Sequence, residues 1–448
     1  MTSQEKIKRL PRYTSYPTAL EFKELGTVTY RHWLSSLNES DAISLYIHIP
    51  YCHQLCWFCG CFMTVSNKNE TISKYVAYLT KEIALISKIT GKKKVSHIHF
   101  GGGSPTILQP DNFEAIMSVI KDKFNIDPHA EIAVEIDPRT LSEEKVRVYS
   151  DCGVNRVSMG IQDFDPDVQK AINRRQSQAL IEKCLGWLTK HGIDDINFDL
   201  IYGLPRQTLK SMKNTIQKAL LYRPSRISLF GYAHVPWVKK HMKMIKKNDL
   251  PKQSARKEMF ECCSAALLEK GYEAIGLDHF ALPEDALVRA KNSGRLKRNF
   301  QGYTTDSATT MIGLGISSIG SFPDGFAQNT PSFPEYFQEI SAGNIPVKKG
   351  LKINKDDLMR RDIISELMCY AKFDPWEISR KHGMAAHFDD EFLALNKLVE
   401  QGFLTQNKTS FSLSKKGLPF RRAVATVFDQ YFPQETDIIA RCLHESEG

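Results

Sequence analysis

The sequence of 448 residues contains no run of about 18 apolar residues, the length that a membrane-spanning helix needs. Its first residues, MTSQEKIKRLPRYTSYPT, lack the apolar core of a signal peptide. We therefore expect a cytoplasmic protein without a membrane partner. Internal repeats and low-complexity segments are also absent, and the 42% of hydrophobic residues exclude a disordered chain.

The chain has little excess of charge of one sign. Lys and Arg number 60 against 51 Asp and Glu, which gives a net charge of +9. Lysine runs lie at residues 92–94 and 239–247, but no nucleic-acid recognition motif accompanies them. Runs of this kind are usually solvated faces, so we expect no nucleic-acid partner. An anionic small substrate accounts for the basic bias equally well.

Apolar segments of strand length alternate with amphipathic segments of helix length over most of the chain. This alternation is typical of repeated βα units around a parallel sheet. The predicted strands are 43–50, 95–100, 131–137, 156–162, 196–203 and 226–232. The predicted helices between them are 71–88, 111–123, 142–150, 177–191 and 209–221. Six such units predict the α/β class and a partial or full barrel.

The two ends of the chain differ from this pattern. Residues 1–32 have no clear period and predict an extended arm, whereas residues 346–448 predict a mainly helical C-terminal domain. That domain has predicted helices at 356–370 and 387–400 and a hairpin at 402–413. We therefore expect three parts, with the barrel at residues 33–345. An apolar segment at 310–321 is rich in glycine, but its spacing does not match a dinucleotide-binding motif.

Four of the ten cysteines lie close together, at Cys52, Cys56, Cys59 and Cys61. In a chain without a secretion signal, such a cluster favours a metal over disulfides. Three thiolates with the spacing Cys52-x3-Cys56-x2-Cys59 can hold three irons of a cubane cluster and leave the fourth iron open. A zinc site with Cys61 as fourth ligand is the alternative, but Cys61 follows Cys59 by only two residues.

Glycines and polar residues gather where the predicted strands end. The Cys loop follows the first strand and Gly101–Ser104 the second, while Glu135, Gln162 and Asp199 lie in the next three. In parallel α/β folds this edge of the sheet carries the chemistry. Because glycines lack a Cβ, they let the backbone approach a ligand closely. The pattern predicts a binding site at this edge.

A Cys-x3-Cys-x2-Cys loop directly after a first strand resembles the radical S-adenosylmethionine (SAM) superfamily. The resemblance implies a [4Fe-4S] cluster whose open iron chelates SAM. It also implies one-electron cleavage of SAM to methionine and a 5′-deoxyadenosyl radical, which abstracts a hydrogen atom.

Four stretches narrow the resemblance: Arg12–Ala19, Tyr46–Pro50 with the Cys loop, Ile201–Pro205 and Asn299–Thr305. They are similar to the oxygen-independent coproporphyrinogen III dehydrogenase family, over nearly the whole chain. The resemblance implies a partial (β/α)6 TIM-like barrel with an N-terminal arm over the active site. It further implies the oxidative decarboxylation of two propionates of coproporphyrinogen III to the vinyl groups of protoporphyrinogen IX, in haem biosynthesis.

Carried over residue by residue, the resemblance implies a role for each matching position. Cys52, Cys56 and Cys59 match the cluster ligands, and Cys61, Arg12 and Gln301 match residues for turnover and substrate. The matches to contacts with two SAM molecules are Tyr46, Phe58, Gly102, Gly103, Ser104, Glu135, Gln162, Arg174, Asp199, Ala233 and Ile319. The family often has Thr in place of Ser104 and a larger polar residue in place of Gly231. For Ala233 and Ile319, packing in the core is nearly as good an interpretation.

The family also implies partners and leaves two alternatives. We expect a monomer that receives electrons from a reductase or a flavodoxin-type donor. A related haem chaperone typically has Asp-Phe in place of Gly60-Cys61 and lacks the arm, so both features argue against it. A radical SAM enzyme that transfers a methyl group or opens haem should differ in the arm and in the Asn299 segment.

Overall fold

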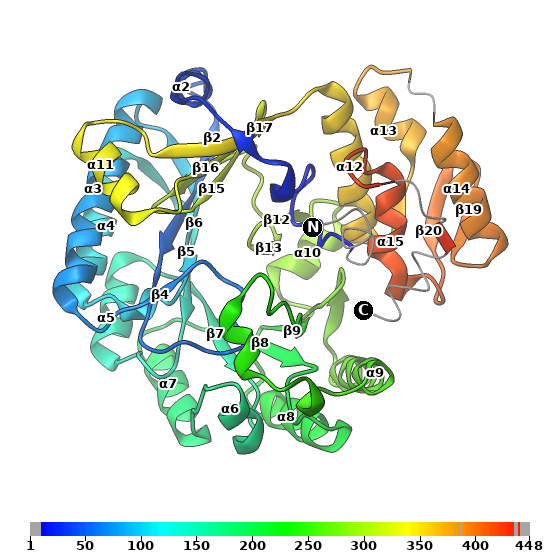
Figure 1. Ribbon diagram of the computed structural model, residues 1–448, viewed down its shortest axis with the longest axis horizontal. Coiled ribbons are helices and arrows are strands. Elements are labelled where there is room, and N and C mark those ends of the chain that lie inside the picture. Colours follow the sequence, from blue (N-terminus) through cyan, green and yellow to red (C-terminus); the bar gives the residue numbers. More distant parts are fainter. Residues whose placement is uncertain (1–9, 386–387, 434–437, 440–448) are drawn as a thin grey trace. The chain divides into compact units, whose positions relative to one another are not determined.

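The computed structural model describes residues 10–385, 388–433 and 438–439, and the chain divides into two compact units (Figure 1). The barrel unit comprises residues 23–272 and 308–351. The composite unit is assembled from residues 1–22, 273–307 and 352–448. Within the described residues, no helix combines the length and the apolar character that crossing a membrane requires.

Six parallel strands of the barrel unit pair in the order of the sequence. They are β2 (Ala42–Ile49), β5 (Lys94–Gly102), β6 (Asn125–Ile136), β7 (Arg156–Gln162), β8 (Asp195–Tyr202) and β9 (Arg226–Gly231). The helices between them include α3 (Asn69–Thr90), α4 (Pro110–Lys123), α5 (Glu143–Cys152), α6 (Pro166–Ala171), α7 (Gln178–Lys190) and α8 (Leu209–Leu221). The prediction of an α/β barrel of βα units is confirmed. The predicted strands and helices agree with these elements to within about two residues, except that β6 begins six residues before the predicted strand 131–137 and that α6 was not predicted.

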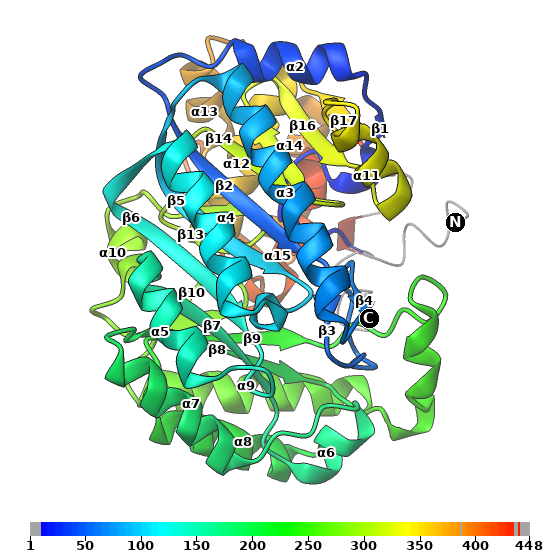
Figure 2. The same cartoon turned by 90° about the vertical axis from the view of Figure 1, so that its left-hand side faces the viewer.

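Apolar and polar side chains alternate along the strands, so each strand has two different faces. In β2, the side chains of Ile43, Leu45 and Ile47 are at most 1% exposed. The helices lie across the outer face of the sheet (Figure 2), and these apolar side chains pack beneath them. Because successive side chains point to opposite faces of a strand, Tyr46 and His48 lie on the inner face. The alternation along the strand thus places apolar side chains in the core and polar side chains on the face that carries the site.

The barrel unit is completed by residues 308–351, which return to the first strand. β14 (Thr310–Leu314) pairs in parallel with β2, and β15 (Ile319–Phe322), β16 (Gly325–Asn329), β17 (Val347–Lys352) and β1 (Lys23–Glu24) follow in the sheet. The apolar segment predicted at 310–321 therefore forms β14 and β15. α9 (Gln253–Glu269) and α11 (Phe333–Ser341) are further helices of this unit.

A buried carboxylate of α3 fixes the loop between β14 and β15. Gly315 N–H and the Tyr336 hydroxyl donate to Glu82 Oε2 at 2.8 and 2.6 Å, and the Asn329 amide donates to Oε1 at 2.6 Å. Burial raises the pKa of Glu82 to about 7. Nearby, the Tyr75 hydroxyl donates to the carbonyl of His48 at 2.7 Å. The returning segment is thereby attached both to α3 and to the end of β2.

The prediction of an extended arm over residues 1–32 is wrong at its end, because Thr27–Ser35 form α2. Tyr30, Trp33 and Leu34 are buried at the spacing of one helical face. The boundary predicted at residue 32 separates Tyr30 from Trp33 and Leu34, so the helical spacing of these three residues could not be recognised. Residues 1–9 of the arm lie outside the described residues.

The composite unit is mixed in structure. Its helices are α10 (Ala286–Asn292), α12 (Lys355–Tyr370), α13 (Pro375–Lys381), α14 (Asp389–Glu400) and α15 (Arg421–Ala425). Its strands are β10 (Glu273–Ile275), β11 (His279–Ala281), β12 (Lys297–Asn299), β13 (Gly302–Thr304), β18 (Lys372–Phe373), β19 (Leu404–Asn407) and β20 (Ser410–Leu413). The helices predicted at 356–370 and 387–400 and the hairpin at 402–413 correspond to α12, α14 and β19–β20; residue 387 lies outside the described residues. The three-part domain division stays a prediction.

Residues 10–18 of the arm are built into the core of the composite unit. Tyr13 and Tyr16 are 4% and 2% exposed and lie in the same apolar cluster as Leu367 of α12. The Tyr13 hydroxyl donates to Asp429 at 2.9 Å, and Gln430 N–H donates to the Tyr16 hydroxyl at 3.2 Å. This part of the arm is therefore a structural element and not a solvated tail.

Candidate active site

A row of polar side chains crosses the inner face of the first three barrel strands. The register of β2 and β5 places Tyr46 beside His99, and their rings stack with centroids 5.9 Å apart. His99 Nε2 lies 3.1 Å from Glu135 Oε1 of β6. On the other side, the Tyr46 hydroxyl lies 3.1 Å from His48 Nδ1. The row thus connects a predicted SAM contact, Tyr46, with another, Glu135.

His48 is a neutral member of this row. Burial lowers the pKa of His48 to about 4, so its ring carries one proton near neutral pH. Its Nε2 lies 3.1 Å from the carbonyl oxygen of Phe62, which can only accept, so that nitrogen holds the proton. His48 Nδ1 then accepts the hydrogen bond of the Tyr46 hydroxyl. His48 therefore orients Tyr46 and contacts the chain directly after Cys61.

Glu135 is accessible because the glycines beside it leave space. Its side chain is 41% exposed, and Gly102 N–H donates to its Oε2 at 3.3 Å. A Cβ on Gly101 would lie 2.8 Å from Glu135 Oε1, and a Cβ on Gly102 would lie 2.5 Å from the ring of His48. Side chains at these positions would displace the polar row, so the glycines fit the prediction of a close approach at this edge.

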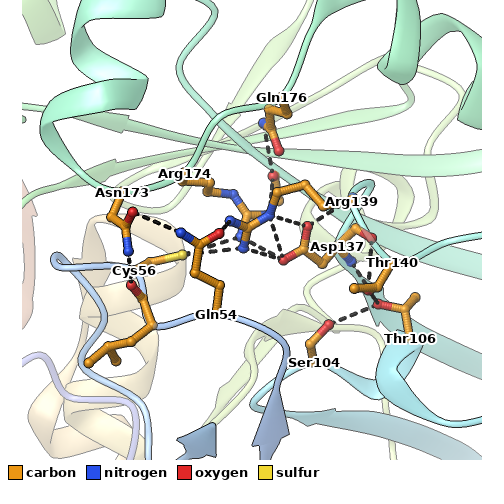
Figure 3. Close-up of polar contacts among 12 residues, drawn as sticks. Gln54, Cys56, Ser104, Thr106, Asp137, Arg139, Thr140, Asn173, Arg174 and Gln176 are labelled. Atoms are coloured by element: carbon orange, nitrogen blue, oxygen red, sulfur yellow. Dashed lines mark hydrogen bonds and ion pairs between the residues drawn. The ribbon is translucent and has the colours of Figure 1, made fainter. Parts of the chain in front are cut away.

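A second polar group lies around Asp137, directly after β6 (Figure 3). Arg139 donates from Nε to Asp137 Oδ1 at 3.0 Å and from Nη2 to Oδ2 at 2.7 Å. Arg174 donates to Asp137 Oδ2 at 2.9 Å and to the carbonyl of Gly160 at 2.7 Å. Burial alone would raise the pKa of Asp137, but the two guanidinium groups outweigh it and hold this pKa well below its usual range.

Both arginines also reach the Cys loop. Arg139 Nη2 and Arg174 Nη1 lie 3.4 and 3.7 Å from the Sγ atom of Cys56, which is 7% exposed (Figure 3). The Asn173 amide donates to the carbonyl of Leu55 at 2.8 Å, and Trp57 N–H donates to the carbonyl of Ile172 at 3.0 Å. The loop is therefore held against the segment between α6 and α7.

The donors of this loop suit an iron–sulfur cluster. In the positions that the side chains adopt, no three Cys, His, Asp or Glu residues of the described chain converge closely enough to hold a metal ion. The donor set nevertheless fits, because Cys52, Cys56 and Cys59 share one short loop and thiolates are the ligands of such clusters. The guanidinium groups of Arg139 and Arg174 contact the Cys56 sulfur from the side of Asp137. Cys52, Cys56 and Cys59 are the residues that would hold the cluster.

Cys61 plays a different part in the loop. A hydrogen bond from the Cys61 thiol lowers the pKa of Cys59 to about 7, and the same bond raises the pKa of Cys61. The pKa values of the two thiols are therefore shifted in opposite directions. That Cys61 is not a cluster ligand stays a prediction.

The remaining predicted SAM contacts lie in varied surroundings. The Ser104 hydroxyl is buried and bonds to Thr106 at 2.8 Å, and the backbone amides of Gly103 and Ser104 donate to the carbonyls of Ile49 and Tyr51. These two amides hold the start of the Cys loop. Asp199 accepts hydrogen bonds of 2.8 Å from both Ser158 and Asn197.

The other four predicted SAM contacts are Gln162, Phe58, Ile319 and Ala233. Gln162 has a φ of +66° at an irregularity in the pairing of β7 with β8, and this strained backbone is frequent at functional sites. Phe58 and Ile319 are half-buried, and Ala233 is exposed. All four belong to the barrel unit, and their contact with SAM stays a prediction.

The segments that carry the two predicted substrate residues, Arg12 and Gln301, contact each other within the composite unit. Arg298 of β12 donates from Nη2 to the carbonyl of Arg12 at 3.4 Å and from Nε to that of Tyr13 at 3.3 Å. Gln301 follows in the β12–β13 turn, where its N–H donates to Asn299 Oδ1 at 3.0 Å. The structure thus brings the arm and the Asn299 segment together, although 286 residues separate Arg12 from Arg298.

Sequence reasoning missed four residues of these groups: His48, His99, Asp137 and Arg139. A signal was present in three of them. His48 lies two residues after Tyr46, His99 lies two residues before Gly101, and Asp137 lies two residues after Glu135. The period of two along a strand places each on the same face as its predicted neighbour.

A barrel of βα units that carries a Cys-x3-Cys-x2-Cys loop after its first strand defines a radical SAM protein. The family model described as "Radical SAM superfamily" matches residues 46–219. The oxygen-independent coproporphyrinogen III oxidase of Bradyrhizobium diazoefficiens is 42% identical over 439 residues, which cover 97% of this chain and 98% of that protein. The protein of the same name from Helicobacter pylori is 38% identical over 94% of both chains.

A solved structure agrees with these relatives. The coproporphyrinogen III oxidase of Escherichia coli, described as a radical SAM enzyme, superimposes with a TM-score of 0.90 at 35% identity and covers 94% of this chain and 97% of that one. The chain belongs to the oxygen-independent coproporphyrinogen III oxidase family. The family and the fold predicted from the sequence are both confirmed.

Proposed function

We propose that this protein converts two propionates of coproporphyrinogen III into the vinyl groups of protoporphyrinogen IX, without oxygen, as a step of haem biosynthesis. The observation that carries the proposal is similarity along the full length to enzymes of that name, together with the Cys loop at the carboxyl ends of the barrel strands. When bound, the cluster and SAM supply a carbon radical that can abstract the unactivated β-hydrogen of a propionate.

The chain's own residues bind and orient these groups. We assign Cys52, Cys56 and Cys59 to the cluster, with one iron open to SAM. The exposed carboxylate of Glu135 suits an ammonium group or ribose hydroxyls, and so does Asp199. Arg174 was predicted to bind a carboxylate of SAM directly, but its Nη1 atom is already paired with Asp137. We therefore assign Arg174 a second role, which is to hold Cys56 and Asp137 in place, and its contact with SAM stays a prediction.

A second SAM beside the first is part of the proposal. Phe58, Gln162, Arg174 and Asp199 are the matching positions, and Ala233 and Ile319 match apolar walls. The cytoplasmic location, the monomeric state and the reductase or flavodoxin-type donor stay predictions.

We expect Glu135→Ala and Asp199→Ala each to weaken SAM binding about ten- to a hundredfold, since a charge-assisted hydrogen bond contributes about 1.5 to 3 kcal/mol. Equilibrium binding of SAM to the anaerobic holoprotein measures the effect. Glu143→Ala is the matched control, because this exposed carboxylate at the start of α5 pairs only with surface side chains. Wild-type affinity in both site variants would refute the assignment.

Anaerobic incubation with coproporphyrinogen III, SAM and dithionite tests the function, with protoporphyrinogen IX, carbon dioxide, methionine and 5′-deoxyadenosine as the expected products. The electron left after each loss of carbon dioxide passes to an electron acceptor in the assay. Methyl transfer or opening of haem in place of this reaction would contradict the proposal. In the same assay, we expect Arg12→Lys to raise the KM for the substrate, because a lysine keeps the charge but loses the planar pair of N–H donors that fits a propionate. An unchanged KM would remove Arg12 from the substrate site.

A further inference from the structure

The segment between β9 and α9 carries an exposed basic surface. Its lysines are Lys239, Lys240, Lys243, Lys246 and Lys247. Residues 237–249 contain a single acidic residue, Asp249, which lies 3.7 Å from Arg206. The side chains of Lys240, Lys243, Lys246 and Lys247 are exposed, and no carboxylate of the described residues lies within ion-pair distance of them. None of these four lysines belongs to the predicted cluster ligands, SAM contacts or substrate residues.

The inner side of the segment is attached to the Cys loop. Lys239 Nζ donates to the carbonyl of Cys61 at 3.0 Å, and His241 Nε2 donates to the carbonyl of Cys59 at 2.8 Å. Met242 and Ile245 are buried in an apolar cluster that has Phe58 at its edge. In Figure 2 the segment lies on the same side of the barrel unit as β3 (Tyr51–Cys52). The segment that carries the lysines therefore contacts the loop that would hold the cluster.

The outer side of the segment is apolar as well as basic. Trp237, Val238 and Met244 are 57%, 61% and 58% exposed and lie within eight residues of one another. Apolar side chains with a charged rim are the usual composition of a protein–protein interface, where Trp and Met are enriched at the centre. Nucleic acid would account for the lysines, but neither for the exposed apolar side chains nor for the contact of the segment with the cluster loop.

We propose that this surface, formed by Trp237, Val238, Met244, Lys240, Lys243, Lys246 and Lys247, docks an acidic electron-transfer protein. The proposal rests on the proposed function, because only a redox cluster at Cys52, Cys56 and Cys59 needs such a partner. The partner carries a reduced flavin or iron–sulfur centre and is oxidised by one electron as the cluster is reduced by one. Complementary charge speeds the encounter, and the apolar centre holds the complex.

The test uses a reduced acidic flavodoxin as the donor and the anaerobic holoprotein as the acceptor. At low salt, we expect the triple variant Lys240→Glu/Lys243→Glu/Lys246→Glu to lower the rate of cluster reduction and the affinity for the flavodoxin about tenfold or more. Loss of the cluster's visible absorption and a titration of flavin fluorescence measure the two effects. High salt should remove most of the difference, because these charges are exposed.

The matched control reverses three exposed lysines at the opposite edge of the sheet, in Lys88→Glu/Lys92→Glu/Lys121→Glu. We expect this control to keep the wild-type rate and affinity. Equal losses in both triple variants, or an unchanged rate in the first, would overturn the proposal. So would a first variant that loses only its affinity for an oligonucleotide or for anionic vesicles.

An assay with dithionite distinguishes the failure of this proposal from the failure of the proposed function. Dithionite is a small reductant that needs no docking surface, so dithionite-driven turnover in the first triple variant should equal that of the wild type. Failure of the wild type to decarboxylate coproporphyrinogen III with dithionite would refute the proposed function and leave the comparison of flavodoxin rates intact.

Discussion

Cys56→Ala should contain no cluster, show no visible iron–sulfur absorption and form no product. A cubane held by three protein thiolates has no spare ligand, so Cys52→Ala and Cys59→Ala should behave in the same way. Iron and sulfide analysis after anaerobic reconstitution, followed by the product assay, measures these losses.

Cys61→Ser is the matched control for these variants, since it removes a thiol from the same loop. It should keep about four irons per chain but lose product formation. The expected loss of product follows from the family resemblance, in which Cys61 matches a residue for turnover and not a cluster ligand. Loss of the cluster in Cys61→Ser would favour a site with four thiolates. An unchanged iron content in Cys56→Ala would contradict the assignment of ligands.

Asp137→Ala should unfold most easily of the site variants. Removal of this carboxylate leaves two buried guanidinium groups without their counter-charge, and breaking such a pair costs about 3 to 5 kcal/mol. The Cys loop should also lose its anchor, because Arg139 and Arg174 connect Asp137 to Cys56. Urea unfolding of the apoprotein and the iron content after reconstitution measure the two consequences separately.

Glu131→Ala provides the control for Asp137→Ala. Glu131 lies on the same strand, β6, and pairs with Arg156 at 2.7 Å, but at the opposite end of the barrel. It should lower stability and leave the iron content unchanged. A full complement of iron in Asp137→Ala would refute the anchoring role of this group.

The pH dependence of Asp137 has a definite sign. The folded protein holds the pKa of Asp137 below its value in the unfolded chain, which is about 3.9. Its contribution to stability is therefore complete above that value and is lost as the pH falls towards the folded pKa. Between about pH 5 and 8, wild type and Asp137→Ala should differ by a constant free energy of unfolding.

The strands and helices of the barrel could be predicted because the pattern of apolar residues within each segment indicates whether it forms a strand or a helix. β7 was predicted as residues 156–162 and has those bounds, since its apolar run is bordered by Gly153 and Pro166. The Cys loop and Glu135 could also be placed, because their positions after or within strands follow from the chain order.

The pairing of Asp137 with Arg174 could not be predicted in the same way. The two residues are 37 positions apart, and their contact depends on how far the segment after β7 turns back across the sheet. The same holds for β14, whose residues pair with β2 across more than 260 positions. Tyr13 is the extreme case, because its partner Asp429 lies 416 positions away. No local pattern in the sequence specifies such contacts.

The interleaving of the two units has a consequence for biosynthesis. The barrel sheet gains β14 only when residues 310–314 exist, and Tyr13 and Tyr16 gain Asp429 and Gln430 only near the end of translation. Neither unit can complete its core until its last residues have been translated, long after its first residues. Contacts between residues so far apart in the sequence also form slowly. In a chain whose translation stops early, neither unit is complete. We therefore expect the cluster to be inserted after translation and not during it.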